Sequence, residues 1–476
     1  MLSAIRNSCR LLVIAVILAV PNWHLRRGKR LARAFERLGP TFIKLGQMLS
    51  TRSDLIGDEM AEDLSGLRDK LPPFPTKIAR AIIEEQLGAS IAQLFDAFDD
   101  VPVAAASIAQ VHRAVTKDGK EVAVKILRPG IEKAFERDLA LFAWIAAMVE
   151  PRMRRLKPLE VVRTLRESVF FELDLRFEAA AATELASNVA KYEPGFRVPS
   201  VDWNLTSRRV LVTEWVEGIP INDVAAIRRS GHDVELILAK VARSLFNQVF
   251  RDGFFHADLH PGNLFVDARG DIVAVDFGIM GRLDLHSRMY IAEILRGFMT
   301  EDYRHVAEVH FVAGYVPAGK SLEMFTQACM AVAKPIIGKP LNEISVAKLL
   351  GQMFKIAAEF EMETQPQLLL LQKTMMVTEG VGRMLNPHLN MWELATPMIE
   401  QWAGDQFGPM GKIKGAAREG YEVVRKLPLM LKAVEDAVTR GMKLHPDSVA
   451  AMEGSRRGNG WLVLGWVAML IILWHS

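Results

Sequence analysis

The sequence has few cysteines and no large excess of charge of either sign. The cysteines are Cys9 and Cys329, and neither belongs to a C-x-x-C pair, which argues against a disulfide framework or a cysteine-ligated zinc site and fits a reducing compartment. The formal net charge of the 476 residues is +3, with basic and acidic residues interspersed, so no nucleic-acid partner is expected. With 50% hydrophobic and 24% charged residues, the chain has a globular composition, and its length predicts more than one compact core.

Long hydrophobic runs are also absent, since no run reaches the roughly 20 residues that usually span a bilayer. Two shorter apolar segments stand near the chain ends. Residues 11–20 follow two arginines and lack a small-residue cleavage site after them, which favours an interfacial or buried helix over a signal peptide. Residues 461–474 have tryptophan at both ends and an Arg-Arg pair before them, which favours a short membrane tail with a cytoplasmic flank. The alternative is a terminal helix docked on the body.

No repeat of fixed period is evident, and the expected elements change in kind along the chain. A β-hairpin is predicted at 111–127, because an Asp-Gly turn separates two β-rich runs. A second hairpin is predicted at 264–275. Helices are expected at 33–71, 76–87, 131–149, 161–187 and 237–250, a further strand at 210–216, and nearly continuous helix from 283 to about 440. The order is thus a helical cap, a small β-rich lobe, a helical lobe holding a hairpin, and a helical extension.

The strongest functional signal is a set of three polar residues around the second hairpin. Asp258 and Asn263 flank a Pro-Gly loop before its first strand, and Asp276 opens an Asp-Phe-Gly sequence after its second strand. Because a hairpin brings its two ends together, we expect these side chains to face a common point. Oxygen ligands of this kind hold Mg²⁺ against phosphates, and a nearby carboxylate can orient or deprotonate an attacking oxygen.

The spacing of these residues matches the catalytic loop and D-F-G of protein kinases, with His256-Ala257-Asp258 where His-Arg-Asp is usual. Each residue alone would more often be a solvated turn residue. Together they predict a Mg-ATP site, with Asp258 as the catalytic base or water-orienting group and Asn263 and Asp276 as magnesium ligands.

A lysine from the first hairpin completes the predicted site. Lys125 ends a Val-Ala-Val-Lys run, on the strand face opposite to Val122, Val124 and Ile126. Kinases use a lysine at this place to hold the α- and β-phosphates of ATP. The alternative is a lysine on an exposed strand face.

The segment before this hairpin lacks the glycines that a kinase carries over the phosphates. It contains small and apolar residues instead: Val103, Ala104, Ala105, Ala106, Ser107, Ile108, Ala109, Gln110 and Val111. Alanines keep the loop compact but restrict positive φ, so we expect a stiffer phosphate loop. The alternative is the start of a short helix, because alanine is the best helix former.

Together these segments resemble the UbiB family of atypical kinase-like proteins. The alanine-rich loop, Val-Ala-Val-Lys, His-Ala-Asp-Leu-His-Pro-Gly-Asn and Asp-Phe-Gly all carry the resemblance. Lys44-Leu45-Gly46-Gln47 matches the family's K-x-G-Q signature, and Glu172-Leu173-Asp174 matches its E-x-D signature. Residues 365–367 and 373–383 are similar to the bacterial members that act in ubiquinone biosynthesis. The resemblance covers about residues 30–410.

The resemblance implies an α+β, protein-kinase-like two-lobed fold with helical extensions at both ends and an apolar C-terminal tail. The expected parts are an apolar and basic segment (1–30), a helical extension with the K-x-G-Q motif (31–100), an N-lobe (101–219), a C-lobe core (220–300), a helical C-terminal extension (301–440) and a membrane tail (455–476). It also implies that Lys44 and Gln47 point toward the nucleotide pocket, that the E-x-D pair contacts this extension, and that the extension covers the site of a protein substrate. For the helix glutamate that kinases pair with the strand lysine, we assign Glu167, with Glu172 as the alternative.

The expected protein is an ATP- and Mg²⁺-dependent enzyme at the cytoplasmic face of a bacterial inner membrane. Its expected partners are membrane lipids, ubiquinone precursors and other ubiquinone-biosynthesis proteins, while its oligomeric state is left open. ATP hydrolysis coupled to access of lipid precursors is the main hypothesis. The alternatives are a protein kinase for a biosynthetic protein, a nucleotide-gated scaffold, and a metallohydrolase using His256, Asp258 and His260, against which the Pro-Gly loop argues.

Overall fold

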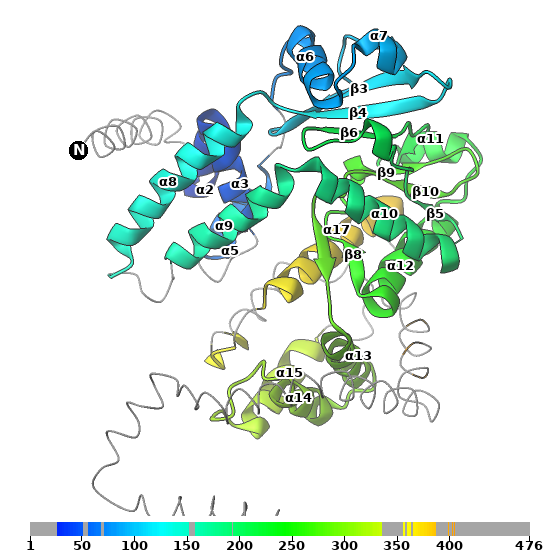
Figure 1. Ribbon diagram of the computed structural model, residues 1–476. Coiled ribbons are helices and arrows are strands. Elements are labelled where there is room, and N and C mark those ends of the chain that lie inside the picture. The colour runs from blue at the N-terminus through cyan, green and yellow to red at the C-terminus, as the bar shows by residue number, and fades with distance from the viewer. Residues whose placement is uncertain are drawn as a thin grey trace, which may run out of the picture. The chain divides into compact units, whose positions relative to one another are not determined.

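The computed structural model describes residues 26–50, 56–67, 71–151, 158–192, 194–335 and 365–386, with isolated positions between 356 and 404 (Figure 1). Within these residues, no helix combines the length and the apolar character that a membrane span requires. The apolar segments predicted at 11–20 and 461–474 lie outside the described residues. The chain divides into two compact units, Met1–Ala403 and Gly404–Ser476, and the helices and strands described below all belong to the first.

In the residues that the structure describes, the N-terminal extension contains the short helices α2 (Arg27–Leu38), α3 (Pro40–Ser50) and α5 (Asp58–Ser65). Their apolar sides join a core with the helices of the N-lobe, in which the rings of Phe42 and Phe142 meet edge to face at 5.0 Å. Gly46 of the K-x-G-Q motif allows this packing, because a Cβ there would lie 2.3 Å from the side chain of Leu67 and 2.7 Å from the ring of Phe35. The motif glycine therefore serves close packing of α3.

The N-lobe is built on a five-stranded antiparallel sheet of order β1-β3-β4-β6, with β2 also paired to β3. Val122, Val124 and Ile126 pack in a core that also contains residues of α6, which places Lys125 on the opposite face. The first hairpin and the helix at 76–87 are confirmed, and Gly88 ends this helix with φ 69°. The elements are α6 (Thr76–Leu87), α7 (Ile91–Leu94), β1 (Phe95–Phe98), β2 (Ala104–Ala105), β3 (Ala109–Thr116), β4 (Glu121–Leu127) and β6 (Val210–Glu214).

The described helices after the hairpin are α8 (Ile131–Val149), α9 (Pro158–Glu172) and α10 (Leu175–Tyr192). The chain leaves the helical path between α9 and α10, at the E-x-D motif. There the Asp174 carboxylate accepts hydrogen bonds from the main-chain N–H of Arg176 and from its guanidinium. Glu172 thus ends one helix, whereas Glu178 lies in the first turns of the next.

The C-lobe combines two small sheets with a helical core. One sheet has the order β5-β10-β9-β7 and includes the second predicted hairpin, and the other pairs β8 with β11. Its elements are β5 (Phe196–Arg197), β7 (Ile219–Pro220), α11 (Val224–Arg229), α12 (Val234–Phe246), the π-helical turn η3 (Asn247–Asp252), β8 (Phe254–His256), the 3₁₀ turn η4 (Pro261–Asn263), β9 (Leu264–Val266), β10 (Ile272–Ala274) and β11 (Met280–Arg282). The 3₁₀ turn η2 (Trp203–Leu205) packs against the N-lobe core instead.

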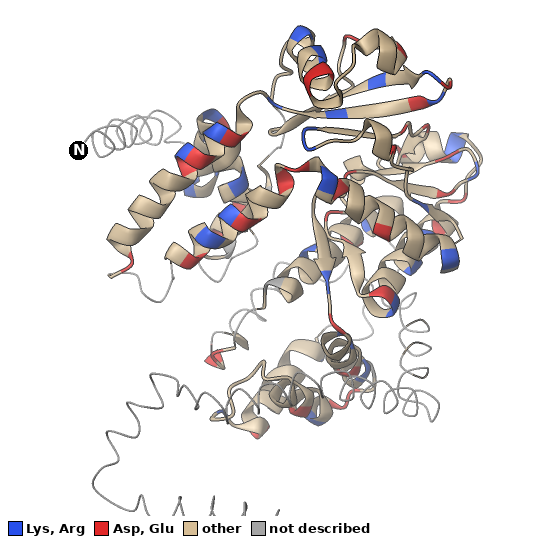
Figure 2. Ribbon diagram, viewed as in Figure 1, with Lys and Arg blue, Asp and Glu red and all other residues tan. Residues whose placement is uncertain are grey.

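The described part of the C-terminal region is helical, with α13 (Leu285–Met299), α14 (Tyr303–Val312), α15 (Leu322–Ala333) and α17 (Pro366–Leu385). Helix α17 returns to the C-lobe, where Leu371, Val381 and Leu385 are buried in its core. Basic and acidic residues are distributed over the helices of both lobes and do not collect on one element (Figure 2). The predicted α+β, kinase-like order of elements is therefore confirmed.

Candidate active site

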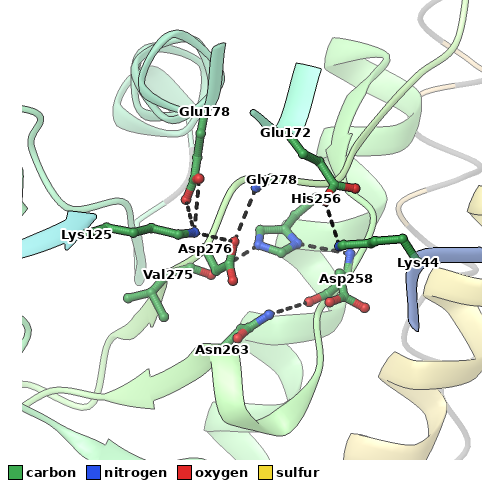
Figure 3. Close-up of polar contacts among 10 residues, drawn as sticks. All are labelled: Lys44, Lys125, Glu172, Glu178, His256, Asp258, Asn263, Val275, Asp276 and Gly278. Carbon is green, nitrogen blue, oxygen red and sulfur yellow. Dashed lines mark hydrogen bonds and ion pairs between the residues drawn. The ribbon is translucent and has the colours of Figure 1, made fainter. Parts of the chain in front are cut away.

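Lys125 lies at the centre of the site and is held by two carboxylates. Its Nζ is 2.7 and 2.9 Å from the two carboxylate oxygens of Glu178 and 3.2 Å from Oδ1 of Asp276 (Figure 3). The side chains of Lys125 and Glu178 are 17% and 10% exposed. A strand of the N-lobe, helix α10 and the Asp-Phe-Gly segment of the C-lobe thus converge on one ammonium group.

The predicted glutamate partner of Lys125 is wrong. Glu167 is exposed on α9, and Glu172 instead pairs with Lys44 at 2.7 Å, with side chains only 10% and 11% exposed. The prediction expected an unbroken helix over residues 161–187, but the break at the E-x-D motif starts a new helix that directs Glu178 at the lysine.

The charges of Lys125 and Asp276 stabilise one another, whereas burial raises the pKa of Glu178. The ammonium of Lys125 outweighs the effect of desolvation on Asp276 and lowers the pKa of that carboxyl to about 2. Burial alone would lower the pKa of Lys125, but the carboxylates of Asp276 and Glu178 outweigh it and raise this pKa. Both Lys125 and Asp276 are therefore charged at neutral pH, as phosphate and metal binding require.

Asp276 has an unusual backbone conformation. Its φ is 63°, in the left-handed region that few residues other than glycine adopt. Its Oδ1 accepts a hydrogen bond from the main-chain N–H of Gly278, and Phe277 is buried against the ring of His256. Backbone strain of this kind gathers at functional sites, where the surrounding structure maintains it.

His256 links the catalytic loop to the Asp-Phe-Gly segment by hydrogen bonds to both. The ring is fully buried, and Nδ1 accepts a hydrogen bond from the main-chain N–H of Asp258 at 3.1 Å. This leaves Nε2 as the donor to the carbonyl of Val275, 3.3 Å away (Figure 3). Burial lowers the pKa of His256, which suits a neutral ring with one donor and one acceptor.

The metallohydrolase reading receives no support from this geometry. His256 uses both ring nitrogens inside the loop, and Nδ1 of His260 accepts from the main-chain N–H of Gly262. Nowhere in the described part of the chain do three histidine, cysteine or acidic side chains gather as a metal site would need.

Asn263 lies across the loop from Asp258. Its Nδ2 donates to the main-chain carbonyl of Asp258 at 3.1 Å, so the amide oxygen is the atom left for other contacts. Asp276 and Asn263 therefore offer one carboxylate and one amide oxygen. This set fits Mg²⁺, which typically takes one or two protein carboxylates and completes its shell with water and phosphate oxygens.

A residue that the sequence interpretation gave no role also reaches this loop. Nζ of Lys373, on α17, lies 3.2 Å from Oδ1 of Asp258. The segment containing Lys373 was noted only for its family resemblance. Lys373 lies 115 residues after Asp258 in the chain, so no local sequence pattern predicts this contact.

The alanine-rich segment forms a tight hairpin, so the alternative of a helix start is wrong. Ala104 and Ala105 pair with Val111 and Gln110, and the N–H of Ala106 donates to the carbonyl of Ala109 at 2.8 Å. Arg128, another residue without a predicted role, donates to the carbonyl of Ala106.

The side chains of this hairpin differ in accessibility. Ile108 and Ala109 are in the core, and the buried Gln110 amide bonds Phe74 and His112, so these residues would reach a nucleotide only through the main chain. Val103 and Ala104 are exposed, while Ala105, Ala106 and Val111 are half-buried. Ser107 is fully buried, and within the described residues its Oγ has no hydrogen-bond partner. A buried hydroxyl without a partner is unusual and is a candidate contact for a ligand.

The K-x-G-Q helix reaches the E-x-D motif through the pair of Lys44 and Glu172, which agrees with the contact implied by the resemblance (Figure 3). Gln47 is half-buried one turn further along α3. Its orientation toward a nucleotide stays a prediction.

Comparisons with known proteins agree with this geometry. The model of the ABC1 atypical kinase-like domain matches residues 66–310, and that of the UbiB helical domain matches residues 329–390. Proteins named "Probable protein kinase UbiB" are similar over most of the chain. One from Marinobacter nauticus is 43% identical over 438 residues, covering 89% of this chain and 80% of the relative. One from Aeromonas hydrophila is 41% identical over 461 residues, covering 94% and 84%.

A solved structure also resembles this chain. The complex of Rv3197 with erythromycin from Mycobacterium tuberculosis superposes with a TM-score of 0.57 at 26% sequence identity, covering 75% of this chain and 92% of the other. The kinase-like domain match, the helical domain match and the full-length relatives together show that the chain belongs to the UbiB family of atypical kinase-like proteins.

Proposed function

We propose that this protein is a Mg-ATP-dependent enzyme that hydrolyses ATP to support ubiquinone biosynthesis. The observation that carries the proposal is the cluster of Lys125, Glu178 and Asp276 beside the loop of Asp258 and Asn263. A structural ion pair would not need a strained aspartate, and a scaffold would not need a carboxylate at Asp258 beside it.

Each residue has a chemical task in this proposal. Lys125 holds the α- and β-phosphates, and Glu178 keeps its ammonium in place. Asp276 and Asn263 hold Mg²⁺, which neutralises charge on the phosphates. Asp258 orients the attacking oxygen and accepts its proton. The hairpin at 103–111 lies over the phosphates, and the Ser107 hydroxyl is its candidate polar contact.

The acceptor in this proposal is water, and the energy serves access to lipid precursors at the cytoplasmic face of a bacterial inner membrane. Helix α3 packs against α8 and α9, and its Lys44 pairs with Glu172 at the end of α9. These contacts attach the N-terminal extension next to α10, the helix that carries Glu178. A membrane location is favoured by the apolar sequence at 461–474.

A second candidate is phosphoryl transfer to a protein of the same biosynthesis. The observation in its favour is the name "Probable protein kinase" that relatives at 41–43% identity carry. The two candidates use the same ATP site and differ only in the acceptor.

Phosphate release by the purified full-length chain tests the proposal. With Mg-ATP and vesicles of anionic phospholipid, we expect free phosphate to form, and Asp276→Asn to abolish it. Asp118→Asn, in the β3–β4 turn, serves as the matched control and should retain turnover. Equal turnover in wild type and Asp276→Asn would defeat the assignment. Label from γ-phosphate that stays on an added biosynthetic protein would favour the second candidate.

A further inference from the structure

Helix α17 brings a lysine to the candidate catalytic carboxylate. Nζ of Lys373 is 3.2 Å from Oδ1 of Asp258, and the two side chains are 34% and 33% exposed. Among the residues that the structure describes, this is the one ion pair of Asp258. The lysine belongs to the helical domain at 329–390, which lies outside the kinase-like match at 66–310.

The position of this lysine is fixed by the packing of its helix. Leu371 and Val381 are 5% and 1% exposed in the core of the C-lobe. Thr374, the next residue, and Thr378, one turn on, are fully buried, and their hydroxyls bond main-chain carbonyls four residues earlier. Because α17 is anchored on both sides of Lys373, the fold presents this lysine at Asp258.

The catalytic loop needs a cation that its own sequence does not supply. From His256 to Asn263 it contains no lysine or arginine. Phosphoryl transfer places negative charge on the oxygens of the terminal phosphate next to the carboxylate of Asp258, and fixed cations stabilise that charge. Lys125 pairs with Glu178 and Asp276, and the proposed function assigns it to the α- and β-phosphates and not to the terminal one.

We propose that Lys373 supplies this cation, so that the helical domain completes the active site. In the nucleotide-free protein its ammonium holds the Asp258 carboxylate, and with ATP bound it also contacts the terminal phosphate. In the transfer step the attacking water oxygen bonds the terminal phosphorus while the bond to the bridging oxygen breaks. ADP leaves with that electron pair, and the water proton passes to Asp258. Lys373 exchanges no proton and acts through its charge.

This inference rests on the proposed function, and nucleotide binding separates the two. Binding of Mg-ATP and of Mg-ADP to the full chain is measured by calorimetry, alongside phosphate release. Lys373→Met should weaken Mg-ATP binding while leaving Mg-ADP binding unchanged, because ADP lacks the phosphate that the lysine contacts. It should also lower kcat by about 100- to 1000-fold. Lys373→Arg should recover part of both effects. Lys334→Met, in the same helical domain, is the matched control and should match wild type.

Any other result separates the role of Lys373 from the proposed function. An unchanged kcat with an unchanged preference for ATP over ADP overturns the role of Lys373 but leaves the proposed function standing. If wild type binds ATP without hydrolysing it, the proposed hydrolysis is refuted. The comparison of Mg-ATP and Mg-ADP affinities in Lys373→Met still tests whether the lysine contacts the terminal phosphate. If Lys373→Met and the milder Lys373→Gln both lose ADP binding or unfold at lower temperature, the lysine only ties α17 to the lobe. Absence of nucleotide binding in wild type refutes both.

Discussion

Replacing Glu178 by glutamine tests the ion-pair assignment at the core of the site. The substitution keeps the shape of the side chain and removes the charge that faces Lys125 at 2.7 and 2.9 Å. Removing one partner of a buried ion pair usually costs about 3–5 kcal/mol, because the other charge stays buried without compensation. Here Asp276 remains 3.2 Å from the ammonium, so we expect a smaller loss, about 1–3 kcal/mol of the free energy of unfolding.

The same substitution should weaken nucleotide binding. Without Glu178, the ammonium of Lys125 is drawn toward Asp276. The ammonium is then less available to the phosphates, and it competes with Mg²⁺ for the Asp276 carboxylate. We expect Mg-ATP affinity to fall about tenfold, equivalent to roughly 1.4 kcal/mol. Denaturant unfolding measures the first effect, and calorimetric titration with Mg-ATP measures the second.

The exposed Glu167 on α9 provides the control, since Glu167→Gln should change the unfolding free energy by no more than about 0.5 kcal/mol. A double-mutant cycle of Glu178→Gln with Lys125→Met should give a coupling energy of at least about 1 kcal/mol. The reasoning is refuted if Glu178→Gln behaves like wild type, or if Glu167→Gln is the damaging change.

Three further outcomes follow from other contacts. A double-mutant cycle of Lys44→Met with Glu172→Gln should give about 1 kcal/mol or more of coupling in unfolding experiments, because this pair is only about a tenth exposed; additive effects would contradict the contact. The pKa of Asp276 is about 2 in the folded protein, whereas the pKa of an aspartate in the unfolded chain is near 4. The ionised Asp276 carboxylate therefore stabilises the fold fully above about pH 4, and this stabilisation is lost as the pH falls toward 2. The difference in unfolding free energy between wild type and Asp276→Asn should therefore fall by roughly 0.5–1 kcal/mol from pH 5 to pH 3, a range reduced because the carboxylate is half-exposed. A difference that does not change with pH would contradict the lowered pKa of Asp276. Gly281→Ala should cost about 1–3 kcal/mol, because its Cβ would lie 2.1 Å from the buried ring of the facing strand, whereas Gly319→Ala, with open space around it, should be nearly neutral in the same unfolding assay.

Local patterns in the sequence were sufficient to predict most of the fold that positions the site. The Asp-Gly turn predicted the first hairpin, and the short apolar runs around residues 264–275 predicted the second. The alternation of valines on β4 correctly placed Lys125 on the face away from α6. These features depend on turn chemistry and on a period of two, both of which are local.

The errors and omissions concern contacts that no local pattern fixes. Glu167 and Glu178 are both helix glutamates in the same stretch, and only the break at Asp174 decides which one faces the lysine. The contact of Lys373 with Asp258 joins residues 115 positions apart through the packing of α17. The hairpin at the alanine-rich loop overrides helix propensity, because pairing with β3 satisfies its main chain.

Calorimetric titration of the purified chain with ATP, with and without Mg²⁺, tests the central claim most directly. Wild type should bind ATP in the presence of Mg²⁺ and much more weakly without it, and Asp276→Asn should lose this dependence on the metal, since its amide is a poorer ligand than a carboxylate. Binding that is equally tight with and without Mg²⁺, or that is unchanged in Asp276→Asn, would contradict the assignment of Lys125, Asn263 and Asp276 to a Mg-ATP site.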